Sequence, residues 1–196
     1  MSLLRRREMM KGGSHTELEY LEFVDMAYID TGYTPGDNTA FEFEAAFNAG
    51  AQCWYGSIST APMVHSRFHG GAEILRTRLC IYTSSGVSIA AIEKSNDAGF
   101  HTYYISKSLC RLDEIEYYSS LAIPQLSLYI GNRNSVGVNS PISYTMNRCR
   151  YAKIYENGEL VRHYIPVLKN GMYCMYEQIQ GKYYYNAAGV GYFTGG

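Results

Sequence analysis

Acidic side chains are the first groups in this 196-residue chain whose spacing could support chemistry. The densest acidic cluster is Asp113-Glu114-x-Glu116. Retaining glycoside hydrolysis needs two carboxylates close together, which an E-x-D-x-x-E strand would place on one face. The sequence contains no such triplet, and the cluster at 113–116 has a different spacing. We therefore expect a protein that is not an enzyme, with no catalytic residue.

Two histidines have the spacing of a metal site. His65 and His69 stand at i, i+4, which suits a metal ion only if this segment is helical. The neighbouring Arg67-Phe68 and Gly70-Gly71 favour a loop instead. Asp37-Asn38 suggests a calcium loop only weakly, and a turn explains the pair. We expect no metal ion and no cofactor.

Aromatic doublets are the remaining candidates for a binding site. The chain has 20 tyrosines, and tyrosine favours strands and amphipathic surfaces. In a strand, one member of each doublet points inward and the other outward. An outward ring can stack on the C–H face of a sugar, although core and edge packing explains much of this pattern equally well. The candidate carbohydrate-binding residues are Trp54, Tyr55, Tyr104 and Tyr118.

Alternating apolar residues indicate many short strands. Phe41 and Phe43 alternate with Glu42 and Glu44, as in a half-buried strand. Asn157-Gly158 separates two alternating runs, which predicts a hairpin with a type I′ turn. The side chains predicted to be largely buried are Phe41, Phe43, Phe47, Leu79, Ile81, Ile154 and Ile165.

Other segments define where the strands end. Pro166 is expected to end the strand that follows Asn157-Gly158, and short aromatic strands should follow around 172–176 and 182–185. Residues 131–141 read as a loop rich in Gly, Asn and Ser. Ile105, Leu109, Leu112 and Ile115 have helical spacing, so a helix there is an open alternative. Short strands with turn signals predict an all-β sandwich or barrel.

Bulk properties narrow the class of protein. The length fits one domain, and a net charge of −1 gives no reason to expect nucleic acid or a membrane as partner. The five cysteines form no C-x-x-C pair, and we expect all five to be reduced thiols. The beginning of the chain does not resemble a signal peptide, and no apolar run reaches the ~20 residues of a membrane span.

Both ends of the chain carry the motifs of a known family. Toward the C-terminus these are Lys153-Ile154-Tyr155, Asn157-Gly158, Leu160-Val161-Arg162, Ile165-Pro166, Tyr176-Glu177, Lys182-Tyr183-Tyr184, Asn186-Ala187, Gly189 and Phe193. Toward the N-terminus they are Leu18-Glu19-Tyr20-Leu21, Tyr28-Ile29-Asp30-Thr31-Gly32-Tyr33 and Pro35. Together they resemble a concanavalin A-like (laminin-G-like) lectin/glucanase family of gut bacteria and their phages and prophages. Glu177 stands where an Asp is more usual.

The resemblance implies an antiparallel β-sandwich, a concanavalin A-like jelly roll, over residues 14–196. It also outweighs the capping box that Ser14-His15-Thr16-Glu17 would form at a helix start. Members of the family are frequent in phages. We therefore expect a virion protein made in the bacterial cytoplasm that decorates a capsid or forms part of a fibre or tail. A free bacterial carbohydrate-binding module is the alternative, and a glycoside hydrolase comes third.

Residues 1–13 differ from the rest of the sequence and end in Gly12-Gly13. Apolar Leu3, Leu4, Met9 and Met10 bracket the basic Arg5, Arg6 and Arg7. Such an arm could bury its apolar residues in a partner while the arginines pair with carboxylates, although a solvated tail is the alternative. We expect it to dock on other virion proteins as part of a multi-copy assembly, with a host-surface glycan as the second partner.

Overall fold

The structure is a computed structural model that describes residues 14–47, 52–53, 55–60, 63–66, 69–70, 76–82, 88–95, 99–118, 126–132, 134–135, 138–139 and 146–196. Side chains are described for residues 14–46, 99–118, 126–132, 134 and 148–196. All regular structure in these ranges is β-strand, so they include no helix long and apolar enough to cross a membrane. The N-terminal arm, Trp54 and the segment 67–68 lie outside the described residues.

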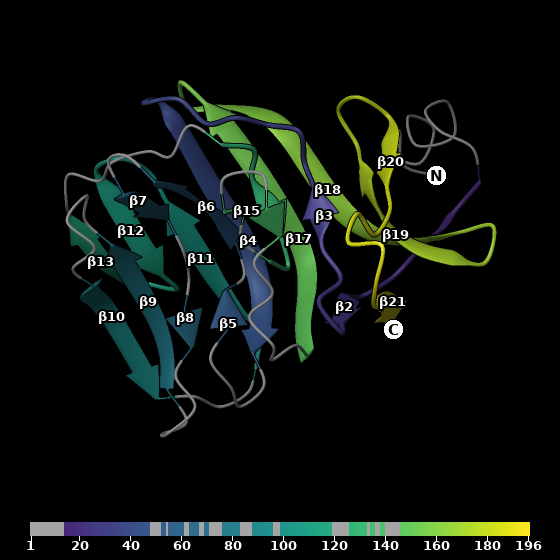
Figure 1. Ribbon diagram of the computed structural model, residues 1–196, viewed down its shortest axis with the longest axis horizontal. Helices are drawn as coiled ribbons and strands as arrows, with labels where there is room; N and C mark the ends of the chain where they lie inside the picture. The colour runs from purple at the N-terminus through teal and green to yellow at the C-terminus, as the bar shows by residue number, and fades with distance from the viewer. Residues whose placement is uncertain are drawn as a thin grey trace, which may run out of the picture.

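The larger sheet runs through most of the molecule (Figure 1). Its path, in order, is β13 (Ile115–Tyr118), β12 (Leu109–Leu112), β11 (His101–Ile105), β4 (Thr39–Phe47), β17 (Met146–Glu156), β18 (Glu159–Lys169), β19 (Met172–Glu177) and β20 (Lys182–Tyr184). Three further strands join it: β1 (Thr16–Glu17) pairs with β18, and β2 (Leu21–Val24) pairs with both β17 and β21 (Tyr192–Gly195). All of these pairs are antiparallel.

A second sheet packs against the first. Its path is β10 (Ser88–Ser95), β9 (Arg76–Tyr82), β7 (Met63–Ser66), β6 (Tyr55–Thr60), β14 (Tyr129–Ile130) and β3 (Ile29–Asp30). β15 (Asn134–Ser135) runs parallel to β6 and pairs with β16 (Val138–Asn139), while β5 (Gln52–Cys53) pairs with β8 (His69–Gly70). Ile29 and Ile130 of this sheet share one apolar core with Phe43 of the larger sheet. The molecule is therefore an all-β sandwich, as the sequence predicted.

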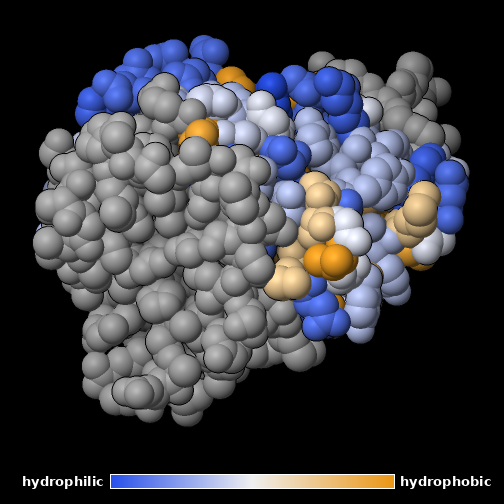
Figure 2. All heavy atoms as spheres, in the orientation of Figure 1, coloured by the Kyte–Doolittle hydropathy of each residue, from blue (hydrophilic) through white to orange (hydrophobic). Residues whose placement is uncertain are grey.

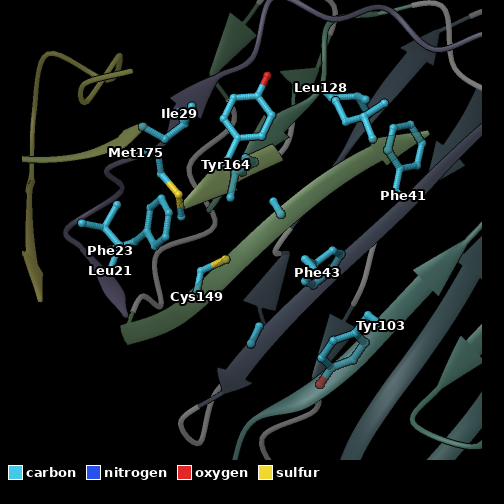
Figure 3. Close-up of a cluster of buried hydrophobic side chains, with 14 of the residues drawn as sticks. Leu21, Phe23, Ile29, Phe41, Phe43, Tyr103, Leu128, Cys149, Tyr164 and Met175 are labelled. Atoms are coloured by element: carbon cyan, nitrogen blue, oxygen red, sulfur yellow. The ribbon is translucent and has the colours of Figure 1, made fainter. Parts of the chain in front are cut away.

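The core confirms the predicted faces of two strands. Phe43 lies opposite Ala152 and Phe41 opposite Ile154 across β4 and β17, and all four side chains are buried. The Phe43 ring stacks on Tyr103, with 5.1 Å between ring centroids (Figure 3). The predicted core residues Phe47, Leu79 and Ile81 lie outside the described side chains.

Ile165 corrects the predicted core in part. It is only half-buried, and it faces the opposite side of β18 from Tyr164. There it packs against Val167 and Tyr176 in a small second cluster. The sheet is thus apolar on both faces near β18 and β19, and on one face elsewhere.

Two Asn-Gly pairs build the hairpins around β18. Asn157 and Gly158 have φ of 53° and 81°, the two positive values that a type I′ turn requires, so this predicted hairpin is confirmed. Asn170 and Gly171 repeat the geometry with φ of 50° and 78° between β18 and β19. The Asn170-Gly171 dipeptide is therefore a hairpin signal of the same kind as Asn157-Gly158.

Pro166 does not end its strand, contrary to the prediction. β18 continues to Lys169, with Pro166 opposite Met175 of β19. The Pro166 carbonyl accepts a hydrogen bond from the Leu18 backbone N–H (3.0 Å), so the missing donor of Pro166 points to the same side. On this side of β18, the pairing with β17 ends at Tyr164 and the pairing with β1 begins at Val167. Pro166 lies between the two, so its missing N–H removes no hydrogen bond from either ladder.

One open alternative and one local prediction also differ from the structure. The helical spacing from Ile105 to Ile115 belongs to three strand segments, because β11, β12 and β13 pair as a meander there. The predicted loop 131–141 contains the short strands β15 and β16. The rejected helix start at 14–17 contains strand β1 (Thr16–Glu17) and no helix, so its rejection is confirmed.

Glu177, from the Tyr176-Glu177 motif, has a clear structural role. Its side chain is 0% exposed at the end of β19, and its carboxylate accepts hydrogen bonds from three backbone N–H groups. These donors belong to His163 (3.0 Å), Ile179 (2.9 Å) and Gln180 (2.6 Å). A buried carboxylate is tolerated when its oxygens are satisfied in this way. Glu177 therefore ties the turn before β20 to strand β18.

The three cysteines with described side chains, Cys110, Cys149 and Cys174, are buried free thiols. Burial raises the pKa of Cys110 to about 12 and that of Cys174 to about 11, and it raises the pKa of Cys149 as well. These thiols are therefore neutral and unreactive near pH 7.

Figure 2 shows one small group of orange and pale orange spheres near the middle of the coloured surface, and other orange spheres apart from it. The exposed apolar side chains of the described residues include Met172, Ile179 and Val190. Small apolar exposures of this kind are normal for a globular surface.

We predict that Phe43→Ala lowers the free energy of unfolding by about 3–5 kcal/mol, because it removes a fully buried ring from a packed core. Leu160→Ala is the control, since Leu160 is 41% exposed and its truncation should cost less than about 0.5 kcal/mol. Urea unfolding followed by circular dichroism would measure both. A cost below 1 kcal/mol for Phe43→Ala would mean that the two faces of β4 are assigned wrongly.

Candidate functional site

The candidate site is the outer face of the larger sheet, the face turned away from the second sheet. Alternation along β4 places Phe41 and Phe43 in the core and Glu42 and Glu44 on this outer face. The same rule places Tyr104 outside, because its neighbours Tyr103 and Ile105 are buried. Polar and aromatic side chains therefore gather on the outer face by strand geometry alone.

One row of side chains crosses six strands on this face. Each member lies directly opposite the next in the strand register, in the order Glu116, Arg111, Tyr104, Glu42, Lys153 and His163. Neighbouring strands are about 4.8 Å apart, so adjacent members can touch. We call this set the cross-strand row.

The middle of the cross-strand row is held by an ion pair. Lys153 Nζ donates to Glu42 Oε1 at 2.8 Å, and both side chains are less than a quarter exposed. Lys153 Nζ also lies 4.4 Å from the centre of the Tyr151 ring. Burial, followed by the Glu42 carboxylate, raises the pKa of Tyr151 to about 12, so this hydroxyl is a neutral donor and acceptor at pH 7.

A β-bulge adds a second cation to the face. The register between β4 and β17 shifts between Cys149 and Tyr151, which leaves Arg150 as an extra residue. Arg150 Nη1 donates to Glu44 at 2.8 Å, and its other Nη donates to Glu19. Without the bulge, Arg150 and Tyr151 would point to opposite faces.

The end of the cross-strand row at β12 and β13 is the open part. Thr102, Arg111, Asp113, Glu114 and Glu116 line a shallow hollow there. The Arg111 guanidinium lies over the Tyr104 ring, 5.2 Å from its centre. The Tyr118 hydroxyl donates to Glu116 at 2.6 Å, while the Tyr118 side chain is 71% exposed.

The acidic cluster of the sequence lies at this hollow, but its members have separate partners. Asp113 accepts hydrogen bonds from the Thr102 backbone N–H (2.9 Å) and pairs with His101 Nδ1 (2.8 Å). Glu116 accepts from Tyr118 instead. Within the described residues no group of His, Cys, Asp and Glu has the geometry of a metal site.

Two of the four sequence-predicted carbohydrate residues, Tyr104 and Tyr118, lie on the outer face beside the hollow. Tyr55 lies on β6 of the second sheet, where only the backbone is described, and Trp54 lies outside the described residues. The arm residues Leu3, Leu4, Arg5, Arg6, Arg7, Met9 and Met10 also lie outside them.

Sequence reasoning missed Arg111, Glu42, Lys153 and Arg150 as site residues. Glu42 and Glu44 were read as solvent-facing, whereas the structure makes both half-buried and ion-paired. Alternation in 41–47 already placed them on one face, but their cationic partners come from β17, more than a hundred residues away.

His163 ends the cross-strand row and makes the stability of the protein depend on pH. Burial, followed by repulsion from Lys153, lowers the pKa of His163 below its ordinary value of 6.5. The unfolded chain therefore binds more protons than the folded protein as the pH falls below about 6.5. Stability that is present above this pH is lost as the pH falls.

We predict that His163→Gln flattens the decrease in melting temperature between pH 7.5 and pH 5, because the substitution removes this proton-linked loss. Thermal unfolding of both proteins at a series of pH values would test it, since other titrating groups cancel in the comparison. NMR titration should also give His163 a midpoint below 6.5. A midpoint above 6.5 would contradict the burial of the imidazole.

Comparison of the sequence with protein-family models and with curated proteins gives no match. The family resemblance therefore stays a prediction from the motifs at the two ends of the chain. The geometry of the outer face supplies the functional evidence.

Proposed function

We propose that this protein is a non-enzymatic structural component of a phage or prophage virion, in a capsid decoration, fibre or tail. In this proposal the lectin-like sandwich attaches to a glycan on the host surface through the outer face of the larger sheet. The resemblance motifs support the virion assignment. The observation that carries the binding role is an open hollow lined by Arg111 and Glu116, with Tyr104 against Arg111 and Tyr118 bonded to Glu116.

That arrangement suits a sugar for two physical reasons. Sugars present C–H faces that pack on aromatic rings, and their hydroxyls need planar polar groups as hydrogen-bond partners. The exposed Tyr118 offers a ring next to Glu116, and Arg111, Glu116 and Thr102 line the hollow with donors and acceptors. The ion pair between Glu42 and Lys153 supports the floor beside it.

The carboxylates of this face favour binding over hydrolysis. Glycoside hydrolysis needs two carboxylates whose oxygens can reach the scissile bond. Glu42 and Glu44 share one face of β4 at i, i+2, the placement that a glycoside hydrolase would need, yet each is paired with a cation. A hydrolase is therefore the less favoured alternative, and a free bacterial carbohydrate-binding module remains the second candidate.

We expect Tyr118→Ala to weaken glycan binding about tenfold, or about 1.4 kcal/mol, while Tyr118→Phe keeps the ring and most of the affinity. Tyr192→Ala is the matched control, because Tyr192 is 54% exposed but lies on β21, away from β12 and β13. A glycan microarray followed by calorimetry on the best ligand would measure the effects. Equal losses for Tyr118→Ala and Tyr192→Ala would place the ligand elsewhere, and no binding to any glycan would reject the binding role.

The virion role has its own test, which concerns residues 1–13. We expect their deletion to leave the melting temperature of the sandwich nearly unchanged and to abolish incorporation into particles. The four apolar residues of the arm gain ~1.5–3 kcal/mol each when fully buried in a partner. Replacing Arg5, Arg6 and Arg7 with Ala should weaken attachment and reduce its sensitivity to salt. Particles purified from an induced host, assayed by mass spectrometry, would show the copy number. Normal incorporation of the truncated protein would mean that the sandwich itself makes the contact.

A further inference from the structure

Two arginines on the outer face have no acceptor for their guanidinium N–H groups within the described part of the chain. These are Arg111 on β12 and Arg148 on β17, both half-buried. Among the residues that the structure describes, neither guanidinium has a hydrogen-bond acceptor or an ion-pair partner, in contrast to Arg150 beside them. The open N–H edges of a half-exposed guanidinium are available to the oxygen atoms of a ligand.

Aromatic rings hold both guanidinium groups in place. Arg111 lies 5.2 Å from the centre of the Tyr104 ring. Arg148 lies 5.4 Å from the centre of the Tyr20 ring and 5.3 Å from that of Phe100. Contact with an aromatic face orients the planar group and leaves its N–H edges available. The two arginines are therefore oriented before any ligand binds.

The carboxylates opposite these arginines in the strand register do not occupy their N–H edges. Glu116 lies opposite Arg111 in the register, but it accepts a hydrogen bond from the Tyr118 hydroxyl. Glu22 lies opposite Arg148, but it accepts from the Thr194 hydroxyl at 3.0 Å. At both places the carboxylate accepts a hydrogen bond from a hydroxyl group and not from the arginine opposite it. Each arginine thus keeps its donors although a carboxylate is its cross-strand neighbour.

The spacing of the two arginines fits a polymer rather than a single sugar. Arg111 and Arg148 are three strands apart across the sheet and about four residues apart along it. At about 4.8 Å per strand and about 3.4 Å per residue, their backbones are separated by roughly 20 Å. Tyr104, Arg150 and Phe100 lie on the same face between or beside them. An extended chain with repeated acceptors could contact both arginines at once.

We propose that the ligand of the outer face is an anionic polysaccharide whose acidic groups bind Arg111 and Arg148. The shared chemistry is an oxyanion that accepts two parallel N–H bonds, as a carboxylate, sulfate or phosphate does. This inference rests on the glycan-binding role proposed above and specifies its ligand class. Since the net charge of the protein is −1, recognition depends on these two contacts and not on a general positive field.

The test compares matched polymers with and without charge. The full-length protein is titrated with dextran, dextran sulfate, polygalacturonate and poly(glycerol phosphate), and binding is measured by affinity electrophoresis and calorimetry. We expect binding to at least one anionic polymer and much weaker binding to dextran. The three anionic probes separate sulfate, carboxylate and phosphate as the preferred group.

Substitutions then assign the contact. Arg111→Gln and Arg148→Gln should each weaken binding to the preferred polymer about tenfold, because each loses a charged hydrogen-bond pair. Arg148→Lys should weaken it nearly as much, since lysine keeps the charge but lacks the planar fork. Lys182→Gln on the edge strand β20 removes one positive charge at an exposed site and should leave binding unchanged. Melting temperatures of all variants would show that they are folded.

Three outcomes would overturn the inference. Equal losses for Lys182→Gln and Arg148→Gln would mean that net charge alone controls binding. Equal affinity for neutral and anionic glycans, unaffected by either arginine substitution, would leave the glycan-binding role intact and reject the anionic ligand. Failure to bind any glycan would reject both proposals together.

Discussion

The pairing of β4 with β17 is the constraint on which the rest of the structure depends. In this register Phe43 meets Ala152 inside the sandwich while Glu42 meets Lys153 outside it. A slip of one residue would move the glutamates into the core and the phenylalanines into water. The core packing and the ion pairs of the outer face are therefore set by one alignment, and each reinforces the other.

The bulge at Arg150 shows how that alignment is adjusted for the site. Before the bulge, Arg148 faces outward and Cys149 inward. After it, Tyr151 faces outward and Ala152 inward. The extra residue places two consecutive side chains, Arg150 and Tyr151, on the outer face, while Cys149 and Ala152 on either side of them stay in the core. A regular strand of the same composition would have buried one of them.

Local patterns in the sequence predicted the parts of the fold that depend on neighbours in the chain. Alternation identified the faces of β4, and Asn157-Gly158 identified a hairpin, because both signals are complete within a few residues. Pro166 was misread because its tolerance depends on where β17 and β1 end, which the local sequence does not contain. Tyr104 and Tyr118 could be named as candidate binding residues from the aromatic doublets, whereas Arg111 and Arg148 could not, because their neighbours come from strands that only the fold brings together.

The two Asn-Gly turns also determine how the molecule ages. In this dipeptide the side-chain amide is attacked by the next backbone nitrogen more readily than elsewhere, which converts asparagine into aspartate or isoaspartate. The Asn157 amide oxygen is held by Asn38 Nδ2 at 2.8 Å, whereas the side chain of Asn170 has no such partner among the described residues. Chemical damage should therefore accumulate first at the β18–β19 hairpin. In a protein that is not replaced for a long time, deamidated Asn170 would be the first sign of age.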